Sequence, residues 1–239
     1  MNPKQYGFRS GRSCLSQLLE HHNKILEEFE MSNNDDVIYL DFAKAFDDVD
    51  HGILLNKLKK IWINFKNGVW IHNFLSNRHK CDAANLTTSS EAQVRSGIPQ
   101  GWVLGPLLFL IHISYINYEI ADSTVSRFYD ETIIPLKIKD EENTQMLQND
   151  LHKLYKLADT NNMKFNANKF DLLRYGKEQE IKFATSYKSY DDSNIDDKEQ
   201  VRDLGIMMNN TATFTVHIRN IVKNARDKMG WVLRVFQSR

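Results

Sequence analysis

The chain has 239 residues, enough for one large domain or two small ones, and its 41% hydrophobic residues argue against disorder. Its 31 Lys or Arg balance 31 Asp or Glu, so the net charge of zero neither favours nor excludes nucleic acid. The two cysteines, Cys14 and Cys81, exclude a disulfide framework or zinc site and suit an intracellular protein, nuclear or cytoplasmic. No signal peptide follows Met1, and the apolar run 103–113 is too short to span a membrane.

Helical and strand patterns alternate along the first part of the chain. Residues 13–30 carry leucine and isoleucine at helical spacing, so they predict an amphipathic helix. The short apolar run 37–40 is typical of a buried strand. Residues 51–61 and 70–75 again predict helices.

Hairpins are predicted in the middle of the chain. Residues 80–95 predict a strand pair around a Thr/Ser-rich turn, and the Gly/Pro-punctuated segment 96–113 predicts a turn leading into a buried helix. Residues 124–138 predict a hairpin that bends at Asp130, followed by a strong helix over 141–161.

The last part of the chain predicts further strands and a basic helix. Short strands are expected in 163–175 and 181–208, around the acidic loop 190–200, and residues 216–236 predict a basic amphipathic helix. The interleaved pattern predicts an α+β fold on an antiparallel or mixed sheet. No Pro/Gly-rich linker divides the chain, so we expect a single domain.

An aspartate follows the buried strand at 37–40. A lone buried carboxylate costs roughly several kcal/mol unless it is paired or neutralised. Asp41 has a structural explanation, as the N-cap of a segment beginning at Phe42. Asp130 and Glu131, at the predicted hairpin bend, have one too, as turn residues.

The three carboxylates also have a functional explanation if the two segments meet in the fold. Carboxylates brought together repel unless a cation lies among them. Mg²⁺ prefers oxygen ligands, and two such ions about 3.5–4 Å apart stabilise the attacking and leaving oxygens in phosphoryl transfer. Asp41, Asp130 and Glu131 therefore predict a site for Mg²⁺, or for Mn²⁺ in its place.

Six segments occur in an order that resembles the reverse transcriptases of non-LTR retrotransposons, the jockey-like group in particular. The resemblance covers nearly the whole chain and implies an RNA-directed DNA polymerase with a right-hand fold. It implies that residues 1–36 are a remnant of the fingers, 37–208 a palm with an antiparallel sheet, and 209–239 the start of a helical thumb. The six segments are QYGFRSGRSC (5–14), YLDFAKAFDDVDH (39–51), SGIPQGWVLGPLLFLI (96–111), FYDET (128–132), MKFNANK (163–169) and VRDLGI (201–206).

The resemblance assigns roles around the metal site. It implies that Asp41, Asp130 and Glu131 are catalytic metal ligands and that Phe42 turns a backbone carbonyl toward the second metal. Phe46 is similar in position to the aromatic steric gate that excludes a 2′-hydroxyl. From the residues alone, a core aromatic in a short helix remains an alternative interpretation of Phe46.

The resemblance also assigns substrate and primer contacts. Gln100 and Gly101 resemble the element that lies against the incoming nucleotide and the template base, although their segment alone predicts only a turn. Lys169 is similar in place to a lysine near the triphosphate, and alone is a surface lysine. The remaining implied contacts are the primer end, at Leu204 and Gly205, and template phosphate, at Arg9 and Arg12.

The sequence departs from the family pattern at several positions. The family usually has Phe-Ala-Asp-Asp at the hairpin, where this chain has Tyr129 before Asp130 and a longer acid at Glu131. Trp102 replaces a small serine, and residues 114–117 replace the usual Asn-Asp-Leu. The chain also begins at the family's second conserved block. These departures imply a truncated and drifting copy that lacks the upstream fingers.

Three functions therefore stay open. The first is a reverse transcriptase that uses an RNA template, a DNA primer, a dNTP and two Mg²⁺ ions. The second is a catalytically inactive relic that at most binds nucleic acid, and the third is a scaffold that binds none. Glu131 and the missing fingers favour the second for this chain, so we expect little primer extension by the chain alone. Salt-dependent binding separates the second from the third.

Overall fold

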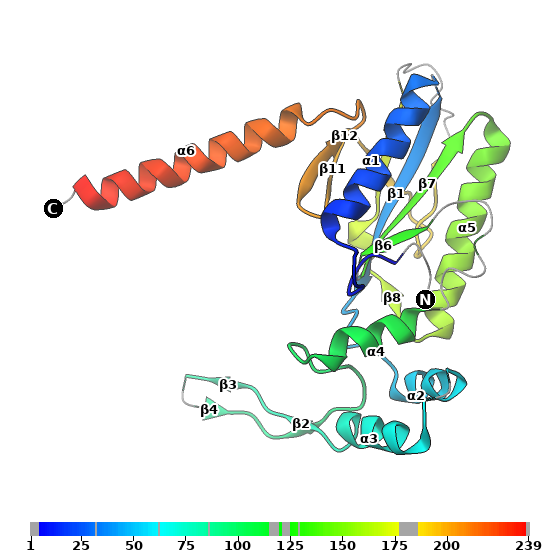
Figure 1. The fold of residues 1–239 in the computed structure, drawn as a ribbon, viewed down its shortest axis with the longest axis vertical. Helices are drawn as coiled ribbons and strands as arrows, with labels where there is room; N and C mark the ends of the chain where they lie inside the picture. Colours follow the sequence, from blue (N-terminus) through cyan, green and yellow to red (C-terminus); the bar gives the residue numbers. More distant parts are fainter. Residues whose placement is uncertain are drawn as a thin grey trace.

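The computed structural model describes residues 5–31, 33–61, 63–85, 87–114, 120, 125–128, 130–176 and 186–237. Its centre is a mixed sheet of six strands (Figure 1). These strands are β1 (Asn34–Ala43), β6 (Ser126–Phe128), β7 (Glu131–Ile138), β8 (Lys164–Phe165), β9 (Asp171–Tyr175) and β10 (Asp196–Lys198). Five lie in the order β10-β9-β1-β7-β6, and β8 pairs with the end of β1. Among the named strands of this sheet in the described part of the chain, β10 and β9 alone pair in parallel, and the predicted α+β class is confirmed.

The central strand β1 is buried on both faces because its side chains alternate between two clusters. Val37 and Tyr39 pack with Ile25 of α1 (Cys14–Glu30) on one face. Ile38 and Leu40 pack on the other face, against a cluster that includes the apolar side of α5 (Glu141–Thr160). Figure 1 shows the two helices flanking the sheet.

Local sequence signals fix where these two helices begin. Ser13 and Ser16 form a reciprocal capping box at the start of α1, with side chain to backbone distances of 3.1 and 2.8 Å. Asp140 accepts a hydrogen bond from the Asn143 backbone N–H at 3.0 Å and caps α5. Both helices begin within a residue of the predicted position.

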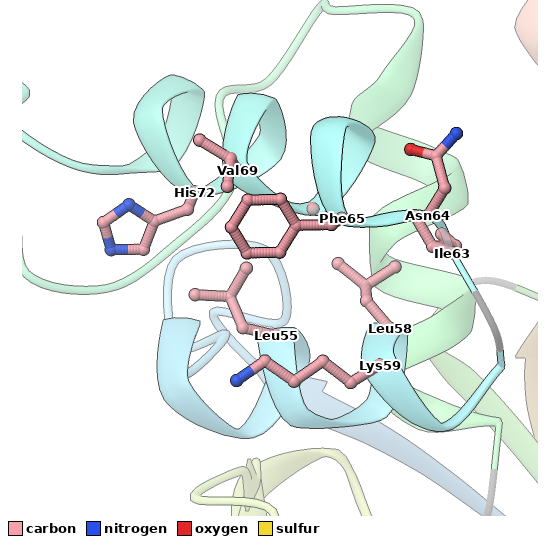
Figure 2. Close-up of a pocket in the computed structure, with 9 residues that line it drawn as sticks. Leu55, Leu58, Lys59, Ile63, Asn64, Phe65, Val69 and His72 are labelled. Atoms are coloured by element: carbon pink, nitrogen blue, oxygen red, sulfur yellow. The ribbon is translucent and has the colours of Figure 1, made fainter.

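A second group of elements lies at one end of the sheet, at the bottom of Figure 1. It comprises α2 (His51–Lys60), α3 (Phe65–Leu75), α4 (Leu104–Ile113) and an arm in which β2 (His79–Lys80) pairs with β5 (Ala92–Gln93) and β3 (Ala83–Ala84) pairs with β4 (Thr87–Thr88). Helices α2 and α3 enclose an apolar pocket of about 270 Å³, into which Leu55 and Phe65 point (Figure 2).

The chain ends in a small hairpin and a long helix. The hairpin consists of β11 (Gln200–Asp203) and β12 (Ile206–Asn209), and α6 (Thr215–Gln237) follows. The Phe214 ring contacts His22 of α1 with a centroid distance of 4.6 Å, and from there α6 projects away from the sheet (Figure 1). Among the described residues, no helix is long and apolar enough to cross a membrane.

The structure corrects three sequence expectations. β1 continues through Asp41 to Ala43, and Phe42 pairs with Phe165 in β8, so the N-cap interpretation of Asp41 is wrong. Helix α3 begins at Phe65 rather than at residue 70. Part of the expected acidic loop 190–200 forms β10. The expectations about Tyr129 and about residues 115–117 lie outside the described residues.

One buried acid on β1 predicts a pH dependence of stability. Burial, and then the nearby Glu28 carboxylate, raise the pKa of Asp35 from 3.8 to about 7. Because the folded state favours the protonated form, Asp35 destabilises the fold progressively as pH rises from about 4 to 7. Asp35→Asn should therefore reduce the stability lost between pH 5 and pH 8 by about 2 kcal/mol. Urea unfolding at pH 5 and at pH 8 measures this difference in the free energy of unfolding.

Asp82→Asn, which removes an exposed carboxylate, is the control for this prediction. If the wild type and both variants lost the same free energy of unfolding between pH 5 and pH 8, the prediction would be contradicted.

Candidate functional site

Two neighbouring strands and a turn bring the predicted acids together. Asp41 on β1 is directly opposite Glu131, the first residue of β7. Phe128 on β6 pairs with Glu131 across the hairpin, so Asp130 lies in the turn between these strands, as predicted. Residues directly opposite in an antiparallel pair have neighbouring side chains on one face, and Asp41 and Glu131 therefore share a face of the sheet.

The acids lie in an environment that disfavours their combined negative charge. Asp41 is only 9% exposed. Burial, and then the Asp41 carboxylate, raise the pKa of Asp130. Burial, and then the charges of Asp130 and Asp41, raise the pKa of Glu131. Like charges and desolvation act in the same direction here, so the cluster favours a cation.

A lysine supplies one positive charge to this cluster. The exposed Lys169 side chain, from the short 3-10 helix η1 (Ala167–Lys169), forms an ion pair with Oδ2 of Asp41, and this contact raises the Lys169 pKa. The segment is docked on β1, because the Asn166 backbone N–H donates to the Asp41 carbonyl at 2.9 Å. The structure therefore brings Lys169 to the acids, and its implied place near the triphosphate stays a prediction.

Two oxygen atoms of the acids are free to bind a divalent cation. Oδ1 of Asp41 and Oε2 of Glu131 are buried and have no hydrogen-bond partner. Within the described part of the chain, no three His, Cys, Asp or Glu side chains form a ready metal cage. Mg²⁺, however, is usually held by one or two carboxylates, several waters and substrate phosphates. The residues present fit such an open site.

The turn between β11 and β12 lies beside the same acids. Asp41, Glu131, Lys169 and Asp203 line a cavity of about 240 Å³. Leu204 and Gly205, the central residues of the turn, have φ of 45° and 89°, as a type I′ hairpin requires.

Contacts at this turn couple it to the acids. The Leu204 backbone N–H donates a hydrogen bond to the Glu131 carboxylate. This contact lowers the pKa of Glu131, against the burial and the charges that raise it. Asp203 is 3% exposed, and burial, and then Glu131, raise its pKa to about 7. The turn predicted to hold the primer therefore meets the hairpin that carries Asp130 and Glu131.

The two aromatic residues predicted at the site, Phe42 and Phe46, differ in burial and packing. Phe42 is buried and stacks on Phe165 with a centroid distance of 4.3 Å, so its ring is not available to a ligand, and the implied role of its backbone carbonyl stays a prediction. Phe46 is half-buried and stacks on Phe109 at 4.8 Å. Phe46 therefore packs against the core, yet it lies in a turn rather than in the short helix of the alternative interpretation.

The other predicted contacts lie apart from the acid cavity. Gln100 and Gly101 are exposed in the loop before α4, where Gln100 lines a larger groove together with Lys44. Arg12 lies over the Tyr6 ring at 4.6 Å and 3.7 Å from Glu20, so its charge already has partners within the chain. Arg9 is half-buried in the turn before α1.

Gly97, which was not predicted as a functional residue, joins the Gln100 loop to the segment that follows Asp41. Gly97 has a φ of +87°, and its N–H donates to the Val49 carbonyl at 2.9 Å. Its carbonyl accepts from Arg78 Nη2 at 2.6 Å and is 2.8 Å from His51 Nε2. The available signal was a glycine between Ser96 and an Ile-Pro pair, because a turn residue that needs positive φ is usually glycine.

Gly97→Ala should destabilise the fold strongly. A Cβ at this position would lie 2.7 Å from the Asp47 carbonyl oxygen and 2.9 Å from its Cα, in a backbone conformation that alanine disfavours. We expect a loss of about 3 kcal/mol or more, combining strain and clash. Thermal unfolding measures it. Gly101→Ala is the matched control, because Gly101 has φ of +80° and open space around it. Equal losses in both variants would show that backbone strain alone matters.

Comparisons with known proteins identify the family of the chain. The family model described as reverse transcriptase (RNA-dependent DNA polymerase) matches residues 1–208. The RNA-directed DNA polymerase from mobile element jockey of Drosophila melanogaster is 27% identical over 245 residues, covering 96% of this chain and 26% of that protein. The probable RNA-directed DNA polymerase from transposon BS of the same species is 34% identical over 107 residues, covering 45% of this chain and 12% of that protein.

Solved structures support the fold. The apo telomerase of Candida tropicalis truncated from its C-terminal domain aligns with a TM-score of 0.56 at 11% identity, covering 87% of this chain and 40% of that one. The telomerase of Candida albicans in complex with a fragment of telomeric RNA aligns with a TM-score of 0.55 at 12% identity, covering 87% and 35%. At such identities the likeness shows the fold alone.

The fold is therefore that of a right-hand polymerase. The chain belongs to the reverse transcriptase family and is a reverse transcriptase domain of the non-LTR retrotransposon type. It spans about a quarter or less of the length of the curated relatives named above.

Proposed function

We propose that the chain is the catalytic palm of an RNA-directed DNA polymerase, which transfers a nucleotide from a dNTP to a primer 3′-hydroxyl. The observation that carries the proposal is the pairing of Asp41 with Glu131 beside Asp130, with two buried carboxylate oxygens that have no hydrogen-bond partner. Acids arranged in this way are suited to holding Mg²⁺ or Mn²⁺ against a phosphate.

The proposed division of labour follows from the contacts at the site. Asp41 and Glu131 would hold the metal through their unpartnered oxygens, with Asp130 as a further ligand. When bound, the metal supplies positive charge at the attacking and leaving oxygens of phosphoryl transfer. Lys169, now paired with Asp41, would exchange that carboxylate for a phosphate oxygen of the dNTP. The catalytic contribution of the chain is then mainly positioning and charge stabilisation.

The remaining contacts are proposed for the nucleic acids and the sugar. The β11–β12 turn at Leu204 and Gly205 would hold the primer end, since it adjoins Glu131. Phe46 would lie under the sugar of the dNTP, with Phe109 stacked behind it. Gln100 and Gly101, exposed in the larger groove, would face the template base and the incoming nucleotide.

One alternative has its own support. Glu131 is one methylene longer than the family's usual aspartate, and Lys169 occupies one oxygen of Asp41. Both features favour a domain that binds nucleic acid without efficient chemistry. In that case the basic face of α6 would provide phosphate contacts, as its five Lys or Arg side chains outnumber its single acid, Asp227.

Primer extension on poly(rA)/oligo(dT), with Mg²⁺ or with Mn²⁺, tests the proposal. A polymerase incorporates dTMP only when a divalent ion is present, and only if Asp41 is intact. Binding of template–primer without incorporation under either ion would favour the alternative. No binding at any salt concentration would exclude both, because phosphate contacts give salt-dependent affinity.

A further inference from the structure

Three aromatic side chains form a row on the surface beside the arm. Trp70 and Phe74 of α3 stack with a centroid distance of 5.8 Å and an interplanar angle of 18°. Phe74 meets Trp102, in the loop before α4, edge-on at 5.2 Å. Phe74 packs against the core, whereas the two indoles are 56% and 59% exposed. A contiguous exposed aromatic surface of this kind marks an interaction site.

The row borders a large groove that is lined by more positively than negatively charged side chains. The groove has a volume of about 1000 Å³ and is lined by Phe74 and Trp102. The charged residues lining it are four cations, Lys44, Arg78, Lys80 and Arg95, and two aspartates, Asp47 and Asp48. The chain as a whole is neutral, so this groove is a local concentration of positive charge.

The groove is built on fixed elements. Arg78 donates to the Leu75 carbonyl at 3.0 Å and to the Gly97 carbonyl at 2.6 Å, so the start of the arm is tied to the Gln100 loop. Lys44 follows directly on the strand that carries Asp41. The groove therefore extends from Lys44, the residue that follows β1, to Phe74 and Trp102 of the aromatic row.

We propose that Trp70, Phe74 and Trp102 form a stacking platform for the unpaired bases of a single-stranded RNA whose phosphates follow the cations of the groove. Aromatic faces interleaved with cations suit single strands, because every unpaired base offers a face for stacking and every nucleotide a negative charge. A duplex offers the charge but keeps its bases stacked on each other. The identification of this strand as the template rests on the proposed function.

The first test measures affinity without chemistry. Fluorescein-labelled oligo(rU), alone or annealed to oligo(rA), is titrated with protein, in the absence of metal and dNTP, and followed by anisotropy. Trp102→Ala should weaken single-strand binding by about 10-fold, whereas Trp102→Phe should retain most of it. Duplex binding should change little in either variant. Phe65→Ala, at an exposed ring of α3 that lines the apolar pocket and not the groove, is the matched control and should leave single-strand binding unchanged.

Measurements over a series of salt concentrations test the proposed contacts between the cations of the groove and the RNA phosphates. Lys80→Gln should reduce the slope of log affinity against log salt by about 0.7 for single strands. The platform is overturned if Trp102→Ala binds oligo(rU) as the wild type does. It is also overturned if the loss is equal for duplex and single strand, or if the folded protein binds no RNA, as expected of a surface for a protein partner.

Primer extension run in parallel separates this inference from the proposed function. Selective loss of oligo(rU) binding in Trp102→Ala, together with no extension by the wild type, supports the platform and contradicts the polymerase. Extension by the wild type, together with unchanged binding in Trp102→Ala, supports the polymerase and overturns the platform.

Discussion

Replacing Asp41 with asparagine is expected to abolish primer extension and to weaken Mn²⁺ binding by more than about 100-fold. Loss of a partner in the outer shell of a metal site already costs roughly 10–100-fold in affinity, and Asp41 is proposed as a direct ligand. The asparagine keeps the shape of the side chain but removes the charge, in a place where the carboxylate is buried and one of its oxygens has no hydrogen-bond partner.

Calorimetric titration with Mn²⁺ measures the affinity, and primer extension measures the activity. Asp47→Asn is the matched control, because Asp47 is an exposed aspartate a few residues further along the same segment. Thermal unfolding should show little change in Asp41→Asn, since it leaves Lys169 exposed to water rather than buried without a partner. Equal Mn²⁺ affinity in the wild type and Asp41→Asn would remove the metal role of this residue.

The candidate acids could be picked out from the sequence because they lie at places where the local pattern is strong. Asp41 interrupts an apolar strand, and Asp130 lies between two β-prone runs, so both positions were evident without a structure. What brought Asp41 together with Glu131 was strand register, and register depends on pairing across the whole sheet. The extension of β1 to Ala43 was missed because its pairing with Phe165 lies far away in the sequence.

Other features could not be predicted because they depend on long-range contacts between polar groups. Nothing in the local sequence says that the Lys169 ammonium pairs with Asp41, since this contact requires the segment after α5 to dock on β1. The position of Leu204 beside Glu131 likewise depends on how the β11–β12 hairpin packs. The row formed by Trp70, Phe74 and Trp102 joins a helix to a distant loop, and helical periodicity alone assigns such aromatics to a core.

The packing beside Glu131 leads to the second large expected effect. Glu131→Asp should increase primer extension by up to about 100-fold. A ligand for Mg²⁺ must lie about 2.0–2.1 Å from the ion in near-octahedral geometry, and an extra methylene moves the carboxylate by roughly 1 Å. A displacement of that size costs on the order of 100-fold in rate. In the wild type the longer side chain also reaches the Leu204 backbone N–H.

The measurement compares wild type, Glu131→Asp and Glu131→Gln in primer extension with Mg²⁺ and with Mn²⁺. Glu131→Gln is the matched control, because it keeps the length of the side chain and removes its charge. The expected order of rates is Glu131→Asp first, then wild type, then Glu131→Gln. Equal rates in all three proteins would mean that Glu131 lies outside the metal site and that Asp41 and Asp130 hold the ion without it. A rate that falls in Glu131→Asp as far as in Glu131→Gln would instead show that the contact with Leu204, which the shorter acid loses, positions the primer turn for the reaction.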